Sequence, residues 1–343
     1  THNDGSYWNK LIALGITPYD LVLRKLSLST LFKLLNILRK EKPDLIHTHG
    51  KGPGLYGRLL GRMLGIPVVH TFHGFQHKLL PVVQRWFYLF VENVLTLLTR
   101  HHIFVGNGEK NKAKVLMFLN DSNSSVVNNG IDLDSIQALP PAEEVLASLK
   151  LGPRESIKIF GTLSRVSPEK GLDTLLEGFV EAAKRAPYIR LLVIGDCPGE
   201  HEKYIKMITQ YIHENGLDDA VKILGAREDA LEILKSIDFY ISPSRSEGLP
   251  YNLLEALAVG KPVMATDIPG NNDIIRKSVE GILVPVNSAR TLAHGILTLL
   301  ELGPEEQKAM RQNGKVRIRD EFSLNLMSEK TFSIYKKVLE GVI

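Results

Sequence analysis

The sequence lacks the features that define several classes of protein. Its 343 residues include a single cysteine, Cys197, which excludes a disulfide framework and a cysteine-rich metal site. A chain with so little cysteine is typical of a reducing compartment, so we expect a cytoplasmic protein. No uninterrupted run of roughly 18 apolar residues occurs, and polar residues break up the nearest candidate, Leu79–Thr99. We therefore expect no membrane-spanning helix.

Charge is distributed unevenly along the chain. The net charge is +4, but residues 1–100 contain 13 lysines and arginines against 5 acidic residues, and residues 101–343 contain 29 against 33. A basic first part suggests an anionic partner, such as a membrane surface, a phosphate or a nucleic acid. The alternative is a basic face that only contacts solvent, and the count alone does not separate the two.

Short apolar runs alternate with amphipathic stretches along the whole chain. The runs are rich in Val, Ile and Leu and end at turn residues, which is typical of buried strands in parallel sheets. Helical patterns such as Thr174–Ala186, His201–Glu214 and Glu228–Lys235 lie between them, so we predict doubly wound α/β sheets. The predicted strands are Asp44–Thr48, Val68–Phe72, His102–Val105, Ser125–Val127, Lys158–Leu163, Arg190–Gly195, Val221–Leu224, Asp238–Ser242, Pro262–Thr266 and Gly281–Val284.

The strand–helix repeat is interrupted after residue 128. Asn128-Asn129-Gly130 is a turn signal, and a short amphipathic helix follows at Glu143–Lys150. We predict a first domain over residues 1–150, a second over 151–320, and a C-terminal helix over 321–343 that packs back toward the first domain.

The segment from Ser242 to Glu255 carries the strongest functional signal. A strand ends at Ser242, a loop contains Glu247, and a helix begins near Pro250 and stops at Gly260. The free N–H groups of this helix point out of the carboxyl edge of a parallel sheet, where doubly wound folds bind phosphates. Glu247 and Glu255 can accept hydrogen bonds from hydroxyls on either side of that phosphate. The alternative is one carboxylate that favours the helix dipole and one surface glutamate.

A second loop of the same kind follows the predicted strand Lys158–Leu163. It contains Arg165 and Lys170 just before the helix Thr174–Ala186. A planar guanidinium and a compact ammonium together suit a diphosphate. Alone, they could be solvated loop cations; beside the glutamate loop, they predict a nucleotide diphosphate site.

On these motifs the chain resembles the retaining GT-B glycosyltransferases of family 4. The resemblance implies an α/β fold of the GT-B type, with two Rossmann-like doubly wound domains facing a cleft. Before Asp44 the sequence has room for one helix, roughly Ser6–Leu14, and one strand, Leu21–Leu26. Relatives open with a strand and a glycine loop, and neither precedes Thr1 here, so we expect a first domain that is incomplete at its start. The matching segments are Asp44–His49, Gly65–Gly74, Asn129–Asp132, the pair Arg165 and Lys170, and the Glu-x7-Glu motif of Glu247 and Glu255.

The resemblance also assigns roles to residues. It implies a retaining reaction that needs no metal or other cofactor, with the leaving diphosphate as the base. The implied roles are diphosphate binding by Arg165, Lys170, Gly248, Leu249 and Pro250, ribose binding by Glu255, catalysis by His73 and Glu247, and acceptor-side or structural positions for His49 and Gly74. A metal-bound His73 is the competing interpretation, but no carboxylate lies between Asp44 and Glu92 to complete a site.

We therefore expect a glycosyltransferase that moves a hexose or N-acetylhexosamine from a nucleotide diphosphate sugar, UDP in preference to GDP. The acceptor would be a glycan or a lipid-linked molecule in polysaccharide or glycolipid synthesis. Docking on the anionic inner face of a membrane is expected from Lys78, Arg85 and Arg100 around the apolar stretch Leu79–Leu98, and no nucleic acid partner is expected. The alternatives are a sugar-nucleotide-binding protein with impaired catalysis and a GT-B-like sugar-nucleotide epimerase.

One further motif is typical of a different kind of site, a dinucleotide-binding loop. Gly52-Pro-Gly54-Leu-Tyr-Gly57 has the spacing of a dinucleotide-binding fingerprint. That fingerprint needs an acidic residue about 20 positions later, and none occurs before Glu92. Gly57, Gly61 and Gly65, spaced by four residues, instead suggest a helix that packs closely on a neighbour.

Overall fold

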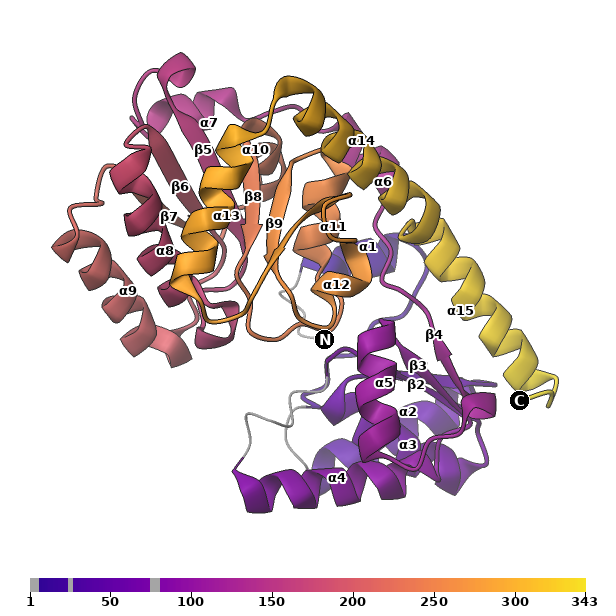
Figure 1. Cartoon of the computed structure of the whole chain (residues 1–343). Helices are drawn as coiled ribbons and strands as arrows, with labels where there is room; N and C mark the ends of the chain where they lie inside the picture. Colours follow the sequence, from indigo (N-terminus) through magenta and orange to yellow (C-terminus); the bar gives the residue numbers. More distant parts are fainter. Residues whose placement is uncertain (1–5, 24–26, 75–80) are drawn as a thin grey trace. The chain divides into compact units, whose positions relative to one another are not determined.

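A computed structural model describes residues 6–23, 27–74 and 81–343 (Figure 1). The chain forms two compact units. The first unit comprises residues 1–105, 110–127 and 330–343, and the second comprises residues 106–109 and 128–329. The last residues of the chain therefore belong to the first unit.

The change from one unit to the other falls at Val127 and Asn128, earlier than the residue 150 suggested by the turn-rich segment. The two short helices of this segment explain the difference. Helix α6 (Leu133–Ala138) packs on α11 (Tyr251–Ala258), and α7 (Glu143–Ser148) packs on α10 (Ala230–Ser236). Residues 128–150 thus bury their apolar side chains in the second unit.

The first unit contains a parallel sheet of four strands in the order β1-β2-β3-β4. The four strands predicted from Asp44 onward are present, each within two residues of its expected start. The strands are β1 (Ile46–His49), β2 (Val68–Phe72), β3 (His101–Phe104) and β4 (Ser124–Val126), and the helices are α1 (Ser6–Ala13), α2 (Leu28–Glu41), α3 (Lys51–Leu64) and α4 (Val82–Thr96). Helices α5 (Asn107–Leu116) and α15 (Leu324–Leu339) begin in the second unit and end in the first.

Two features before β1 differ from the sequence prediction. Residues 21–23, the described part of the predicted strand Leu21–Leu26, form no strand, and residues 24–26 lie outside the described residues. Helix α2 was not predicted, although it has an ordinary start signal: the Ser27 side chain accepts a hydrogen bond from the Thr30 N–H. A helix, rather than a strand, therefore leads into β1.

The second unit contains a parallel sheet of six strands in the order β10-β9-β8-β5-β6-β7. This is the Rossmann order, in which the chain starts at the centre, builds one half outward and then returns to build the other. The strands are β5 (Lys158–Leu163), β6 (Ile189–Ile194), β7 (Val221–Gly225), β8 (Phe239–Ser242), β9 (Val263–Thr266) and β10 (Gly281–Val284), and the remaining helices are α8 (Leu172–Arg185), α9 (Glu202–Glu214), α12 (Asn271–Ile274), α13 (Ala289–Glu301) and α14 (Pro304–Glu321).

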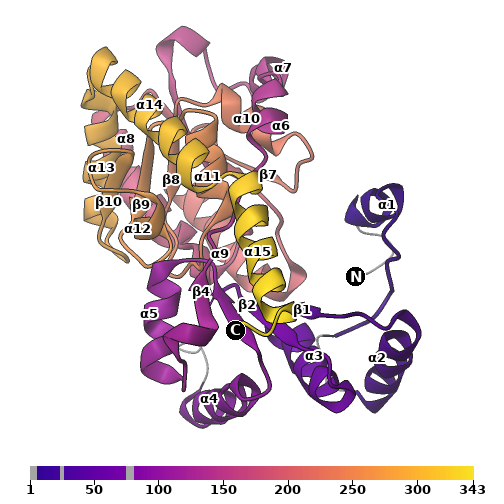
Figure 2. The same cartoon turned by 90° about the vertical axis from the view of Figure 1, so that its right-hand side faces the viewer.

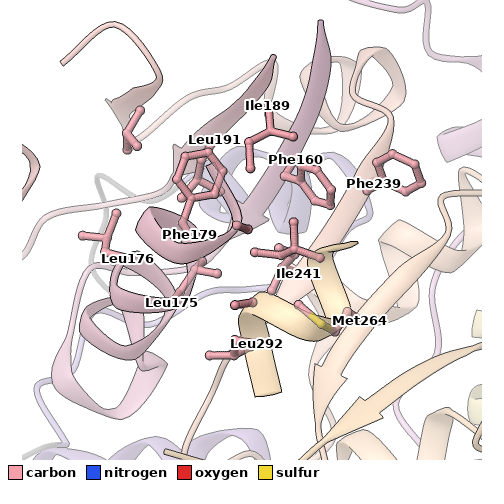
Figure 3. Close-up of a cluster of buried hydrophobic side chains, with 14 of the residues drawn as sticks. Phe160, Leu175, Leu176, Phe179, Ile189, Leu191, Phe239, Ile241, Met264 and Leu292 are labelled. Atoms are coloured by element: carbon pink, nitrogen blue, oxygen red, sulfur yellow. The ribbon is translucent and has the colours of Figure 1, made fainter. Parts of the chain in front are cut away.

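The core of the second unit lies between this sheet and the helices α8 and α13, which run side by side (Figure 1 and Figure 2). Phe160 of β5 stacks on Phe239 of β8, with ring centroids 4.9 Å apart. Phe179 of α8 and Leu292 of α13 reach the same cluster (Figure 3). Alternate strand residues face the other side, where α10 contacts β5. The sheet is therefore buried on both faces, as its continuous apolar strands require.

The glycine-rich segment Gly52–Gly57 lies within helix α3, not in a loop that could cradle a dinucleotide. A side chain at Gly57 would come within 2.3 Å of Thr48, and one at Gly61 would come within 2.3 Å of Val68. These two glycines let α3 approach β1 and β2, as predicted. Gly65 differs: it ends the helix in a left-handed conformation with φ 71°.

Candidate active site

The two loops predicted to bind a diphosphate meet at one edge of the second sheet. One follows β5 and the other follows β8, and these strands are neighbours at the point where the strand order reverses. Ligands of open α/β sheets bind at the carboxyl ends of the strands at such a switch point. The topology therefore places both loops where a nucleotide is expected.

Lys170 and Glu247 come together in this site, although 77 positions separate them in the sequence. The Lys170 Nζ atom lies 2.7 Å from Glu247 Oε1, and the side chains are only 16% and 9% exposed. The Ser244 hydroxyl donates to the same carboxylate oxygen at 2.7 Å. The ammonium predicted to hold a diphosphate is thus paired with the carboxylate predicted to take part in catalysis.

Arg245 fixes the spacing of the two loops. Its backbone N–H donates to the Glu169 carbonyl at 2.8 Å, and its guanidinium donates to the Asp173 carboxylate at 2.7 Å and to the Thr174 hydroxyl at 2.9 Å. Gly171 permits the close approach, because a side chain there would come within 2.3 Å of the Pro243 carbonyl. Arg245 was not predicted, since the sequence shows only one more cation in a loop.

Helix α11 presents its N-terminus to the same edge. Pro250 is the N-cap residue, one position before the helix proper, and the first N–H groups of a helix have no partner within it. Asn252 donates its side-chain amide to the Leu163 carbonyl at the end of β5. The start of α11 is therefore fastened to the strand that leads into the Lys170 loop.

Glu255 lies in the second turn of α11. Burial raises the pKa of its carboxyl group above the usual value, and no described residue donates a hydrogen bond to its side chain. Burial also raises the pKa of the Tyr240 hydroxyl, and the charges of Glu247 and Glu255 add to that effect. A half-buried carboxylate with free acceptor positions is suited to bind hydroxyl groups of a ligand.

The segment Gly248–Pro250 is held by close backbone contacts. The Asn129 side-chain amide donates to the Leu249 carbonyl at 2.8 Å, and the Leu249 side chain is buried. Gly270, with φ 96°, passes so close that a side chain there would come within 2.5 Å of the Gly248 carbonyl. The loop is therefore held by contacts within the second unit.

Arg165 differs from the other site residues. Its side chain is 57% exposed, and its nearest ionic partner is Glu169, at 3.8 Å. It lies in the same loop as Lys170 but is not in contact with the Glu247 pair. A surface guanidinium of this kind gains little from its ion pair, so it is free to turn toward an anion.

The predicted histidines lie in the first unit, at the carboxyl ends of β1 and β2. His49 Nδ1 lies 2.8 Å from His73 Nε2. His47 lies between the Thr71 hydroxyl, at 2.7 Å, and the Tyr335 hydroxyl of α15, at 2.5 Å. Burial is the main cause that lowers the pKa of His47 to about 3 and that of His73 to about 4. These imidazoles are neutral at neutral pH.

The sequence also predicts a role for Gly74, and it predicts neither a metal site nor a membrane-spanning helix. Gly74 follows His73 with φ 129°, a conformation that favours glycine. Within residues 6–23, 27–74 and 81–343, no three His, Cys, Asp or Glu side chains are grouped to hold a metal ion. No described helix is both long and apolar enough to cross a bilayer.

Comparison with known families agrees with this geometry. The family described as Glycosyltransferase Family 4 matches residues 10–135, and the family described as Glycosyl transferases group 1 matches residues 148–317. The chain is 29% identical over 330 residues to the Escherichia coli UDP-Gal:alpha-D-GlcNAc-diphosphoundecaprenol alpha-1,3-galactosyltransferase, covering 91% of this chain and 77% of that protein. It is also 29% identical over 283 residues to the Streptococcus pneumoniae alpha-monoglucosyldiacylglycerol synthase, covering 80% of this chain and 62% of that protein.

Solved structures share the fold at lower identity. A glycosyltransferase from Rickettsia africae superposes with a TM-score of 0.84 at 22% identity, covering 98% of this chain and 89% of that chain. HepE from Anabaena, solved with UDP and with UDP-glucose, superposes with a TM-score of 0.84 at 20% identity, covering 97% of this chain and 90% of that chain. The two parallel sheets and these likenesses confirm the predicted fold class.

Proposed function

The chain belongs to the GT-B glycosyltransferases of family 4, and we propose that it transfers a hexose or N-acetylhexosamine from a UDP-sugar with retention of configuration. The observation that carries this proposal is the meeting of Lys170 and Glu247 at the switch point of the second sheet, beside the N-terminus of α11. Cation, helix terminus and carboxylate are there combined in one site.

In this proposal each group of the site acts on a different part of the donor. Lys170 and Arg165 bind the diphosphate and, with the N–H groups at the start of α11, stabilise the negative charge that develops as it departs. Glu255 accepts hydrogen bonds from the ribose, and Glu247 accepts them from the transferred sugar. His73, neutral because burial lowers its pKa to about 4, faces sugar or acceptor as a hydrogen-bond partner. No metal ion is needed, because cations and a helix terminus already neutralise the leaving group.

UDP is proposed as the nucleotide because relatives and neighbours point to it. The E. coli relative is named for UDP-galactose, and HepE was solved with UDP-glucose. The test is thermal unfolding of the whole chain with UDP-glucose, UDP-galactose, UDP-N-acetylglucosamine and GDP-mannose, because a bound ligand stabilises the folded protein. We expect the UDP-sugars to raise the melting temperature. Protection by GDP-mannose alone would contradict the UDP assignment.

Turnover separates the transferase from its alternatives. Incubation with the donor and a lipid-diphosphate sugar should release UDP and give a product whose anomeric configuration matches that of the donor, as read by NMR. Conversion of the sugar in the absence of any acceptor would identify an epimerase instead. Binding of UDP-sugars with no release of UDP would identify a binding protein with impaired catalysis.

The proposed acceptor is a lipid-linked sugar or a lipid at a membrane surface. Two relatives carry names with lipid acceptors or products, a diphosphoundecaprenol and a diacylglycerol. The first unit of this chain presents a surface suited to such a partner. Arg85 is half-buried in α4, Arg100 is exposed, and Lys78 and Leu79, which the sequence prediction included, lie outside the described residues.

Helix α4 has two apolar faces. Leu89 and Leu95 are buried on one face. The other face carries an exposed stripe at helical spacing, defined here as the α4 stripe: Val83, Phe87, Phe90, Val94 and Leu97, between 44% and 81% exposed. A helix that is apolar all round belongs in a core or against a membrane, and this one is only half covered.

The neighbouring loop enlarges the α4 stripe. Phe118 is 82% exposed, and its backbone N–H donates to the Asn93 side chain of α4 at 2.7 Å. Trp86 is 64% exposed on the same helix. Exposed apolar patches with aromatic side chains mark interaction sites, and aromatic rings are favoured at the membrane–water interface. We therefore propose that α4 lies on the membrane that holds the acceptor.

Vesicle flotation of the whole chain tests this docking. Phe90→Ser should weaken vesicle binding by roughly 1.5–3 kcal/mol, about 10- to 150-fold, because a buried phenylalanine side chain is worth that much. Phe332 of α15 is 71% exposed and serves as the matched control; Phe332→Ser should leave binding unchanged. Equal losses for both variants would contradict docking through α4.

A further inference from the structure

A depression at the amino edge of the first sheet has no role in the proposed reaction. It encloses about 560 Å³ between the end of α3, the start of β2 and the residues that follow α4. The site residues of the first unit, His49 and His73, lie at the opposite, carboxyl edge. The depression is therefore not part of the substrate site. Its walls include Arg62, Ile66, Leu97, Leu98, Arg100 and Val338.

The composition of these walls is that of a surface for an amphipathic anion. Ile66, Leu97 and Leu98 supply apolar contacts, and the lining residues include no Asp or Glu. Arg62 and Arg100 are both exposed. The Arg100 Nε atom donates to the Ile343 backbone oxygen at 2.7 Å. Arginine presents a planar fork that matches phosphate oxygens.

The depression is continuous with the α4 stripe. Leu97 is the last member of that stripe and is 80% exposed, and it also forms a wall of the depression. Met63, next to Arg62, is 65% exposed. If α4 lies in the interface with its apolar side chains among acyl chains, the depression at its end lies at the level of the headgroups.

We propose that this depression binds the phosphate of an anionic phospholipid, with Arg62 and Arg100 as its ligands and Leu97 against the adjoining chain. The inference rests on the proposed docking of α4 and specifies its lipid partner. Arg62 also lies in the last turn of α3, where a cation favours the helix dipole. A purely structural role for Arg62 would change the melting temperature and not lipid selectivity.

The test compares vesicles of phosphatidylcholine with and without phosphatidylglycerol, using the whole chain at low salt. The wild type should bind more tightly to vesicles that contain phosphatidylglycerol. Arg62→Gln combined with Arg100→Gln should lower binding to these vesicles by about 25-fold, since each cation near an anionic surface contributes about fivefold. Binding to pure phosphatidylcholine and to UDP should not change.

The matched control removes the same charge from α2. Lys33 and Arg39 are exposed in the same unit, and Lys33→Gln combined with Arg39→Gln should lower binding less than about twofold. An equal loss in this control would overturn the proposal in favour of net charge alone. Equal wild-type binding to both vesicle types would also overturn it and leave docking through α4 intact.

Two further outcomes separate this inference from the proposals on which it rests. A wild type that floats with neither vesicle type would contradict the docking of α4 as well, while protection by UDP-sugars would still support the transferase. Inorganic phosphate provides the last arm. Thermal protection by phosphate that requires both arginines, without vesicle selectivity, would show a site for free phosphate and overturn the lipid assignment.

Discussion

Replacing Glu247 by glutamine should move nucleotide binding and turnover in opposite directions. The Glu247 carboxylate holds the Lys170 ammonium at 2.7 Å, and both side chains are largely buried. A diphosphate must take Lys170 from this partner in order to bind. Glu247→Gln keeps the shape of the side chain but removes the competing charge, so UDP should bind more tightly to the variant.

The size of the effect follows from the contact. Hydrogen bonds to charged groups are worth about 1.5–3 kcal/mol. The Lys170–Glu247 contact joins two charged groups and belongs at the upper end of that range, whereas a contact of Lys170 with glutamine keeps only one charge and belongs at the lower end. Freeing Lys170 from glutamine therefore costs less by up to about 1.5 kcal/mol, which corresponds to as much as roughly 10-fold tighter UDP binding. Turnover of a UDP-sugar should fall by about 100-fold, because Glu247 would no longer accept charge-assisted hydrogen bonds in the transition state.

Calorimetry with UDP and a turnover assay with the UDP-sugar measure the two effects. Glu200→Gln removes an equal charge from an exposed position, since that side chain is 74% exposed, and should change neither quantity. In a Lys170→Met background, Glu247→Gln should increase UDP affinity less, because there is no ammonium for which Glu247 and the diphosphate compete. A double-mutant cycle measures this coupling. Weaker UDP binding to Glu247→Gln, or an undiminished gain without Lys170, would refute the reasoning.

Four further predictions follow from the same contacts. Glu255→Ala should weaken UDP binding by about 1.5–3 kcal/mol in calorimetry, because it removes charge-assisted hydrogen bonds to the ribose; unchanged affinity would contradict the ribose assignment. A chelator should leave turnover intact, and activity lost to the chelator and restored by Mn²⁺ would show that a metal is required. Glu92→Gln should destabilise the protein by about 3–5 kcal/mol in denaturant unfolding. The fully buried Arg58 guanidinium lies 2.9 Å from the Glu92 carboxylate and would lose its counter-charge. A loss below about 1 kcal/mol, which is the range of an exposed ion pair, would contradict this. Acid should destabilise the first unit, because burial lowers the pKa of His47 and of His102 to about 3, below the 6.5 of unfolded histidine. Between these two pKa values the unfolded chain binds more protons than the folded chain. The free energy of unfolding is therefore full above about pH 6.5 and falls as the pH drops toward 3. Hydrogen exchange should show that loss first in residues 27–74 and 81–105 of the first unit, and a uniform loss in both units would contradict it.

The strands could be predicted because the sheets are buried on both faces. The predicted strand Lys158–Leu163 is a continuous apolar run, unlike the alternating pattern of a surface helix. Strand β5 has the predicted bounds. Helix α2 could not be separated in the same way, since its Leu-rich sequence follows another apolar run without a Gly or Pro between them. The run Leu21–Leu26 therefore resembles a short buried strand, and Ser27 is the one local signal that a helix begins there.

The candidate site could be predicted as a set of residue types on two loops, but not as a set of contacts. Arg165 and Lys170 look alike in the sequence, yet only Lys170 is paired with Glu247, and Arg165 is exposed. The difference arises from the turn at Gly171, whose approach to Pro243 brings one loop onto the other. Arg245 shows the same limit, because its importance comes from Asp173, a residue 72 positions away.

The positive excess of residues 1–100 does not by itself locate a surface for an anionic partner. Arg58 and Glu92 are buried together, so their charges cancel in the interior and leave the positive excess of residues 1–100 to other side chains. The exposed cations that remain include Lys33 and Arg39 on α2 as well as Arg62 at the end of α3. Because this excess is spread over several helices, it can draw the unit toward an anionic surface but cannot orient it. Orientation requires a localised feature, and the α4 stripe is such a feature among the described residues.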